Sequence, residues 1–140
     1  MLTGMVIEAM QLRNPTDLVH AVYAGGLHRN AIAGIVPVVQ QAADAGDAVA
    51  ADIVSRASIE LAVAASSVIT RLEMRGERFP TLLSGGVFRG VPALVPQVAA
   101  RLAEVAPRSE VRTLDVEPAA GAVTLALAAA RGRLTVPAYI

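Results

Sequence analysis

The sequence predicts a helix-rich α/β protein that ends in a small parallel β-α-β-α unit, and three observations lead to this fold class. Apolar residues recur at three- and four-residue intervals through most of residues 1–75, as in amphipathic helices. Two short apolar runs, 80–84 and 110–116, have the composition of strands. A helical pattern follows each run, and this order with short connections makes the two strands parallel.

Size and composition indicate a single domain with an aliphatic core. The chain has 140 residues, of which 54% are hydrophobic but only 3% aromatic, so Ala, Val, Leu and Ile must fill the interior. This length is sufficient for a core without a disulfide or a structural metal. We divide the domain into a helical part of about 1–76, a β-α-β-α part of about 77–132 and a tail of 133–140.

Charge and residue content exclude several classes of function. The formal net charge is zero, so neither nucleic acid nor an anionic membrane is an expected partner. With no Cys, disulfides, iron–sulfur clusters and thiol catalysis are excluded. The histidines, His20 and His28, lack metal-site spacing, and no metal site is predicted. The apolar stretch 48–72 carries four charged residues and there is no signal peptide, so we expect a cytoplasmic protein.

The helical part is predicted to contain four helices, over residues 5–12, 17–24, 29–45 and 48–75. Thr16 is suited to cap the second helix, and Pro37 predicts a kink or a break within the third. Gly46 suits the left-handed position after a helix, and Asp47 suits the N-cap of the longest helix.

The longest helix carries an apolar stripe at three- and four-residue intervals. The stripe consists of Val49, Ile53, Ala57, Leu61, Ala64, Val68 and Leu72. Ala62, Ala65 and Ser66 form a second face of small residues, so this helix is expected to be central and covered on more than one side.

The β-α-β-α part is predicted to contain strands 80–84 and 110–116 and helices 92–106 and 118–130. The inner face of the first helix is expected to hold Leu94, Val95, Val98, Leu102 and Val105. Two parallel strands are too few for an independent sheet, because parallel sheets are normally wider and covered on both faces. We therefore expect the rest of the sheet to belong to a portion of protein absent from this chain.

The most informative segment is the glycine doublet Gly85-Gly86 directly after the first strand. Glycines permit backbone dihedrals that other residues avoid and remove side chains that would keep a ligand away. The carboxyl edge of a parallel sheet is where α/β proteins place ligands. Taken alone, a strand followed by two glycines is more often only a tight turn.

Three segments together carry a resemblance that spans about residues 19–131. They are Ala-Ala-Asp-Ala-Gly-Asp-Ala at 42–48, Gly-Gly-Val-Phe at 85–88 and Glu-Pro-Ala-Ala-Gly-Ala at 117–122. In this order they resemble the carboxy-terminal domain of the BadF/BadG-type ATPase and N-acetylglucosamine kinase family. The resemblance implies one lobe of an actin-like, ribonuclease H-like fold that binds Mg²⁺ and ATP between two lobes.

The resemblance also implies which residues face the nucleotide. Gly85 and Gly86 would lie against the adenosine, with Val87 bordering the base, and Gly121 and Ala122 would lie close to the same pocket. The family phosphorylates the 6-hydroxyl of an amino sugar with an Asp general base and Mg²⁺-bound phosphates. The phosphate loops and this Asp have no match and would precede Met1, so we expect no catalytic residue and no kinase activity in this chain alone.

The sequence leaves a second class of function open, a non-catalytic binding or assembly module that dimerises through its exposed sheet edge and Ala-rich helices. A homo-oligomer is expected under either hypothesis, because a lobe that normally packs against another exposes apolar area.

Asp44, Asp47 and Asp52 are expected to serve as caps or solvated residues rather than as a metal cluster. Arg89 is expected to face solvent and Glu117 to lie at a helix amino terminus.

Overall fold

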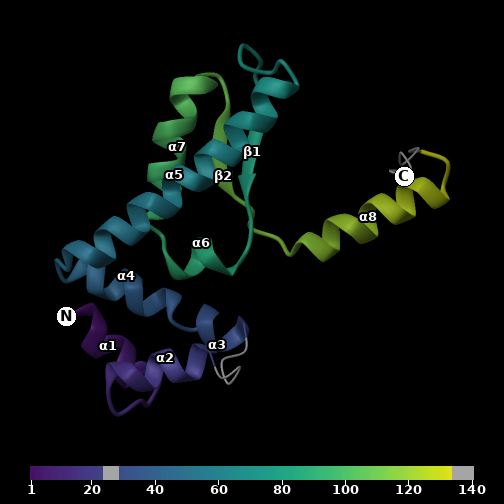
Figure 1. Ribbon diagram of the computed structural model, residues 1–140. Helices are drawn as coiled ribbons and strands as arrows, with labels where there is room; N and C mark the ends of the chain where they lie inside the picture. The colour runs from purple at the N-terminus through teal and green to yellow at the C-terminus, as the bar shows by residue number, and fades with distance from the viewer. Residues whose placement is uncertain (24–28, 134–140) are drawn as a thin grey trace.

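The structure of the protein is a computed structural model that describes residues 1–23 and 29–133 (Figure 1). The first half contains five helices among these residues: α1 Leu2–Ala9, α2 Pro15–Tyr23, α3 Arg29–Ala33, α4 Val36–Asp44 and α5 Ala48–Arg71. The second half contains β1 Pro80–Leu83, α6 Gly86–Gly90, α7 Leu94–Val105, β2 Glu110–Thr113 and α8 Pro118–Ala130. The predicted helix-rich α/β class is confirmed.

Helix α5 is the centre of the packed part of the molecule. Its amino-terminal half packs on α4, and its remaining length packs on α7 (Figure 1). One cluster of buried residues joins α5 and α7 to the strands, through Ala62, Ile69, Leu83, Val98, Leu102 and Ala106. A second cluster, Val54, Val91 and Leu94, joins α5 to α4 and α6. Phe88 packs against both clusters.

The two strands are parallel, as predicted, with Pro80 paired to Glu110 and Leu83 to Thr113. One face of this small sheet packs inward through Leu83 and Val111. The other face is open, and Leu82 is 47% exposed. Parallel strands normally have both faces covered, so this sheet has space for further protein.

The local signals at the helix ends are largely confirmed. Gly46 has φ +88, and the Asp47 side chain caps α5 by accepting hydrogen bonds from the amides of Val49 and Ala50. The helix expected around Pro37 is broken into α3 and α4, with the proline in the first turn of α4. Thr16 was the wrong cap, because α2 begins at Pro15 and Asn14 Oδ1 accepts from the Asp17 amide at 3.1 Å.

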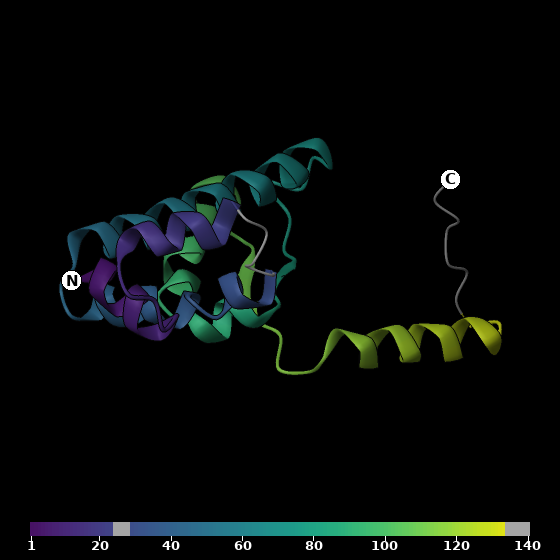
Figure 2. The same cartoon turned by 60° about the horizontal axis from the view of Figure 1, so that its bottom comes forward.

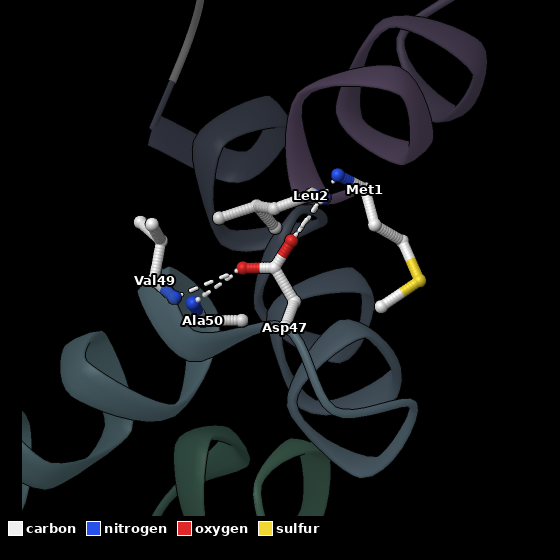
Figure 3. A network of polar contacts seen from close by, with 5 residues as sticks. All are labelled: Met1, Leu2, Asp47, Val49 and Ala50. Atoms are coloured by element: carbon white, nitrogen blue, oxygen red, sulfur yellow. Dashed lines mark hydrogen bonds and ion pairs between the residues drawn. The ribbon is translucent and has the colours of Figure 1, made fainter.

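Asp47 also joins the start of the chain to α5 (Figure 3). Its Oδ2 accepts a hydrogen bond of 2.8 Å from the Leu2 amide and lies 3.3 Å from the amino group of Met1. Hydrogen bonds from the Leu2 and Ala50 amides, with the nearby amino group, lower the pKa of Asp47 to about 2 from an ordinary value of 3.8. The charged carboxylate thus holds α1 against the start of α5.

Asp47→Asn tests this role, because Asn is an equally good N-cap but has no charge to titrate. The pKa of Asp47 is lower in the folded chain than in the unfolded chain, so its contribution to stability is present above about pH 4 and is lost as the pH falls towards about 2. We expect the thermal midpoint of the variant to be lower at pH 7 and to fall less steeply over that acidic range. Thermal melts followed by circular dichroism measure both effects, and parallel curves for the two proteins would contradict this assignment.

The predicted apolar stripe of α5 is not its buried face. The helix buries Ala50, Val54, Ser58, Ala62 and Ile69. Three of these are small, and of the predicted small-residue face Ala62 is buried while Ala65 and Ser66 are half-buried. Small side chains allow α7 and α4 to approach α5 closely, and Arg101 Nε of α7 donates to the buried Ser58 hydroxyl at 3.1 Å. The larger apolar residues of the stripe are exposed over most of its length.

Helix α8 extends away from the rest of the chain, as both views show (Figures 1 and 2). The helix predicted over residues 118–130 is confirmed, but none of its residues is buried. Val123, Leu125 and Leu127 are about half exposed or more. Within the described residues, α8 therefore contributes little to the core.

Among the residues that the structure describes, one helix, α5, is long and apolar enough to cross a membrane by length and composition alone. Its buried face packs on α4 and α7, and the central helix of a folded domain passes the same test. This finding is therefore weak support for a membrane span.

Candidate functional site

A pocket of about 520 Å³ lies at the carboxyl ends of both strands. The segment after β1 contributes Leu83, Ser84, Gly85, Phe88, Arg89 and Pro92. The segment after β2 contributes Thr113, Leu114, Asp115, Val116, Glu117 and Pro118. This volume is within the range of small-molecule sites, and the position is the one that α/β proteins use for ligands.

Gly85 is the residue that turns the chain out of β1 into this pocket. Its φ of +113 and ψ of 166 lie in a region that is essentially restricted to glycine. Gly86 begins the short helix α6 and has no positive φ. No atom beyond the chain neighbours lies within 4 Å of a β-carbon built at either position, so the doublet is open to solvent on this rim.

Helix α6 was not predicted from the sequence. It occupies Gly86–Gly90, where we expected only the loop after the strand. The second strand also ends earlier than predicted, at Thr113, where the Leu114 amide donates to the Leu83 carbonyl at 2.9 Å. The early end of β2 leaves 114–117 free to form one wall of the pocket.

The charged groups of the pocket are one guanidinium and two carboxylates. Arg89 Nη1 lies 3.8 Å from Glu117 Oε1, and both side chains are largely exposed. Asp115 lies on the same wall. A site with more carboxylates than cations is poorly suited to a triphosphate, but its carboxylates are good acceptors for hydroxyl groups. The chemistry suits the uncharged part of a ligand.

The structure brings together only some of the residues predicted to face a nucleotide. Gly85 lines the pocket, and Gly86 is exposed next to it. Val87 points to a different place, a small apolar groove between α4, α5 and α6. Gly121 and Ala122 lie on α8 and do not line the pocket.

The wall formed by Thr113, Leu114, Asp115 and Val116 was missed as a set of site residues. The signal was available, because parallel strands end at the same edge and the rule applied to β1 holds equally for β2. The sequence places Asp115 within the last two residues of the second predicted strand, 110–116, as it places Ser84 at the end of the first, 80–84.

The carboxylates expected to be structural have structural partners. Asp44 accepts from Gln40 Nε2 at 2.7 Å, Asp47 caps α5, and Asp52 pairs with Arg56 at 2.7 Å. Across residues 1–23 and 29–133, no group of three or more His, Asp or Glu side chains is placed to hold a metal ion. His20 is exposed on α2, whereas His28 lies outside the described residues.

Comparison with known proteins adds one relative. The chain is 26% identical over 125 residues to an N-acetylmuramic acid/N-acetylglucosamine kinase of Clostridium acetobutylicum. It is similar to a sugar kinase. The aligned stretch covers 89% of this chain but only 41% of that kinase, so the similarity concerns less than half of the relative. No family model and no solved structure matches the chain.

Proposed function

We propose that this chain is the nucleotide-facing carboxy-terminal lobe of an ATP-dependent amino-sugar kinase of the N-acetylglucosamine or glucosamine type. The proposal rests mainly on Gly85. This residue has no side chain, so it leaves the backbone accessible at the carboxyl rim of the parallel strands, beside a 520 Å³ pocket. The similarity to a sugar kinase over 89% of the chain supports the same proposal. The actin-like fold, a cytoplasmic location, ATP and Mg²⁺ are parts of this proposal.

The pocket is proposed to hold the nucleoside rather than the phosphates. The aromatic ring of Phe88 and the side-chain-free backbone at Gly85 provide a surface for a flat base. The carboxylates of Asp115 and Glu117 are acceptors for the ribose hydroxyls. Arg89 pairs with Glu117 in the free chain and so balances part of this negative charge.

Catalysis is proposed to need the rest of the kinase. In-line phosphoryl transfer depends on groups that position the phosphates and neutralise developing charge. The pocket supplies Arg89 as its one cation, which is too little for a triphosphate and its metal. The amino sugar, the Mg²⁺-bound phosphates and the general base are therefore assigned to the complementary lobe, and the open face of the sheet at Leu82 provides space for further protein.

Titration of the isotopically labelled chain with adenosine tests the pocket. We expect amide shifts at Gly85, Arg89, Asp115 and Val116, with a dissociation constant on the order of 1 mM because half of the cleft is open to water. ADP should give the same pattern with little extra affinity. NMR spectroscopy locates the response residue by residue.

A matched pair of variants controls this experiment. Ser84→Trp places a large side chain in the pocket and should abolish the adenosine shifts. Ser67→Trp makes the same change at an exposed serine in the groove between α5 and α7 and should leave them intact. Shifts that map away from the strand ends, or that persist in Ser84→Trp, would show that the nucleoside does not bind in this pocket.

The second candidate is a non-catalytic homodimeric module. The exposed apolar stripe of α5 favours it, because exposed apolar stripes of this length are typical of protein–protein contacts. Absence of any nucleoside response in a chain that dimerises would favour this candidate over the kinase lobe.

A further inference from the structure

Helix α6 lies between α4 and the ends of the strands and separates two cavities (Figure 1). On one side Val87 of α6 and Val91, the residue after it, line an apolar groove of about 120 Å³ towards α4 and α5. On the other side Phe88 and Arg89 line the pocket of about 520 Å³ at the strand ends. A displacement of α6 away from α4 therefore also changes the shape of the pocket.

Gly90, the last residue of α6, is where this helix approaches α4 most tightly. A β-carbon built at Gly90 would lie 3.3 Å from Cγ1 of Val36 and 3.8 Å from Cγ of Pro37, both in the first turn of α4. The first of these distances is shorter than an ordinary contact between carbon atoms. The φ of Gly90 is not positive, so its backbone conformation does not require glycine. The residue is therefore small because Val36 occupies the space.

We propose that Gly90 is a positioning residue for the candidate nucleoside pocket. Its contact with Val36 fixes α6, and with it Phe88 and Arg89, relative to the strand ends. The residues that line the pocket come from segments 83–92 and 113–118, so α4 acts on the pocket through α6 rather than by contact. This role rests on the proposed function, because the ligand is taken to be a nucleoside.

A β-carbon at position 90 should displace α6 rather than Val36. Val36 is β-branched and lies in the first turn of a helix, where one χ1 rotamer is strongly preferred. Helix α4 packs against both α1 and α5, whereas α6 is only five residues long. Phe88 holds α6 to both core clusters, so we expect a shift of a few tenths of an ångström rather than detachment.

Arg89 transmits this shift to the pocket, because it directly precedes Gly90. Its Nη1 lies 3.8 Å from Oε1 of Glu117, which comes from the opposite wall. Movement of α6 changes this distance and the position of the guanidinium beside the ligand. Binding depends steeply on such alignment, since small errors of position cost much of the interaction between fixed groups.

A double-mutant cycle between Gly90 and Val36 tests the proposal. Gly90→Ala should raise the dissociation constant for ADP by roughly fivefold. Val36→Ala alone should leave the constant within about twofold of the parent value, because Val36 does not line the pocket. The double variant should also return to within about twofold, since loss of Cγ1 makes room for the new β-carbon.

Gly76→Ala is the matched control for the single substitution. Gly76 also has no positive φ, and no atom beyond its chain neighbours lies within 4 Å of a β-carbon built there. This variant should bind ADP within about twofold of the parent value. NMR titration measures all the constants, and chemical denaturation checks that each variant is folded. Unchanged ADP binding in Gly90→Ala, or a loss that Val36→Ala does not restore, would overturn the proposal.

A measurement without ligand separates this proposal from the proposed function. In the free chain, Gly90→Ala should shift the amide signals of Asp115, Val116 and Glu117 on the facing wall, and the double variant should restore them. Absence of these shifts would also count against a positioning role for Gly90. Their presence in a chain that binds neither adenosine nor ADP would contradict the nucleoside assignment and still support the control of the pocket by α4.

Discussion

Leu102→Ala is expected to lower the free energy of unfolding by about 3 kcal/mol. Leu102 of α7 has no exposed surface and lies in the cluster that joins α5, α7 and the strands. Removal of its branched side chain takes away packing against Ala62 and Ile69 of α5 and leaves a cavity. The rigid backbone of two packed helices can close only part of such a cavity. Chemical denaturation with circular dichroism detection measures the change.

Leu127→Ala is the matched control for that experiment. Leu127 lies on α8, is 49% exposed and has no buried neighbour on its own helix. The same substitution there should change the free energy of unfolding by less than about 0.5 kcal/mol. Similar losses at Leu102 and Leu127 would mean that α8 packs in solution on a surface other than the one described, and the assignment of the core would need revision.

Gly85→Ala is expected to lower the free energy of unfolding by about 2 kcal/mol. No neighbouring atom obstructs a β-carbon at Gly85, so the loss comes from the backbone alone. At φ +113 and ψ 166 an L-residue is strained, and the chain must either keep the strain or move α6 relative to β1. Thermal and chemical denaturation report the loss of stability.

Gly86→Ala separates this backbone strain from any general intolerance at the rim. Gly86 also has space for a β-carbon but has no positive φ, and it begins α6. Alanine has the higher helix propensity, so the substitution should be neutral or slightly stabilising. Equal losses at the two positions would contradict the assignment of the positive φ to Gly85 alone. If the proposed nucleotide approaches this part of the rim, Gly86→Ala should weaken its binding without a loss of stability.

Only part of the candidate site could be predicted from the sequence. The strand, the glycine doublet and the following helix were sufficient to place Gly85 at an open sheet rim, because these features depend on neighbouring residues. Asp115 and the wall that follows β2 were not predicted from the sequence. The sequence-based prediction also assigned Val87, Gly121 and Ala122 to the same pocket, whereas the structure directs Val87 to the opposite groove and carries α8 away. Those placements depend on how the chain turns after each strand.

The sequence by itself determined four features of this protein: the capped start of α5 at Asp47, the break at Pro37, the parallel pair of strands and the inner face of α7 at Leu94, Val98 and Leu102. Each of these depends on local backbone chemistry or on a clear apolar period. Only the tertiary structure decided which face of α5 is buried. Both faces are apolar, and the small one lies inward because close approach of α4 and α7 gains more contact than a looser fit against larger side chains.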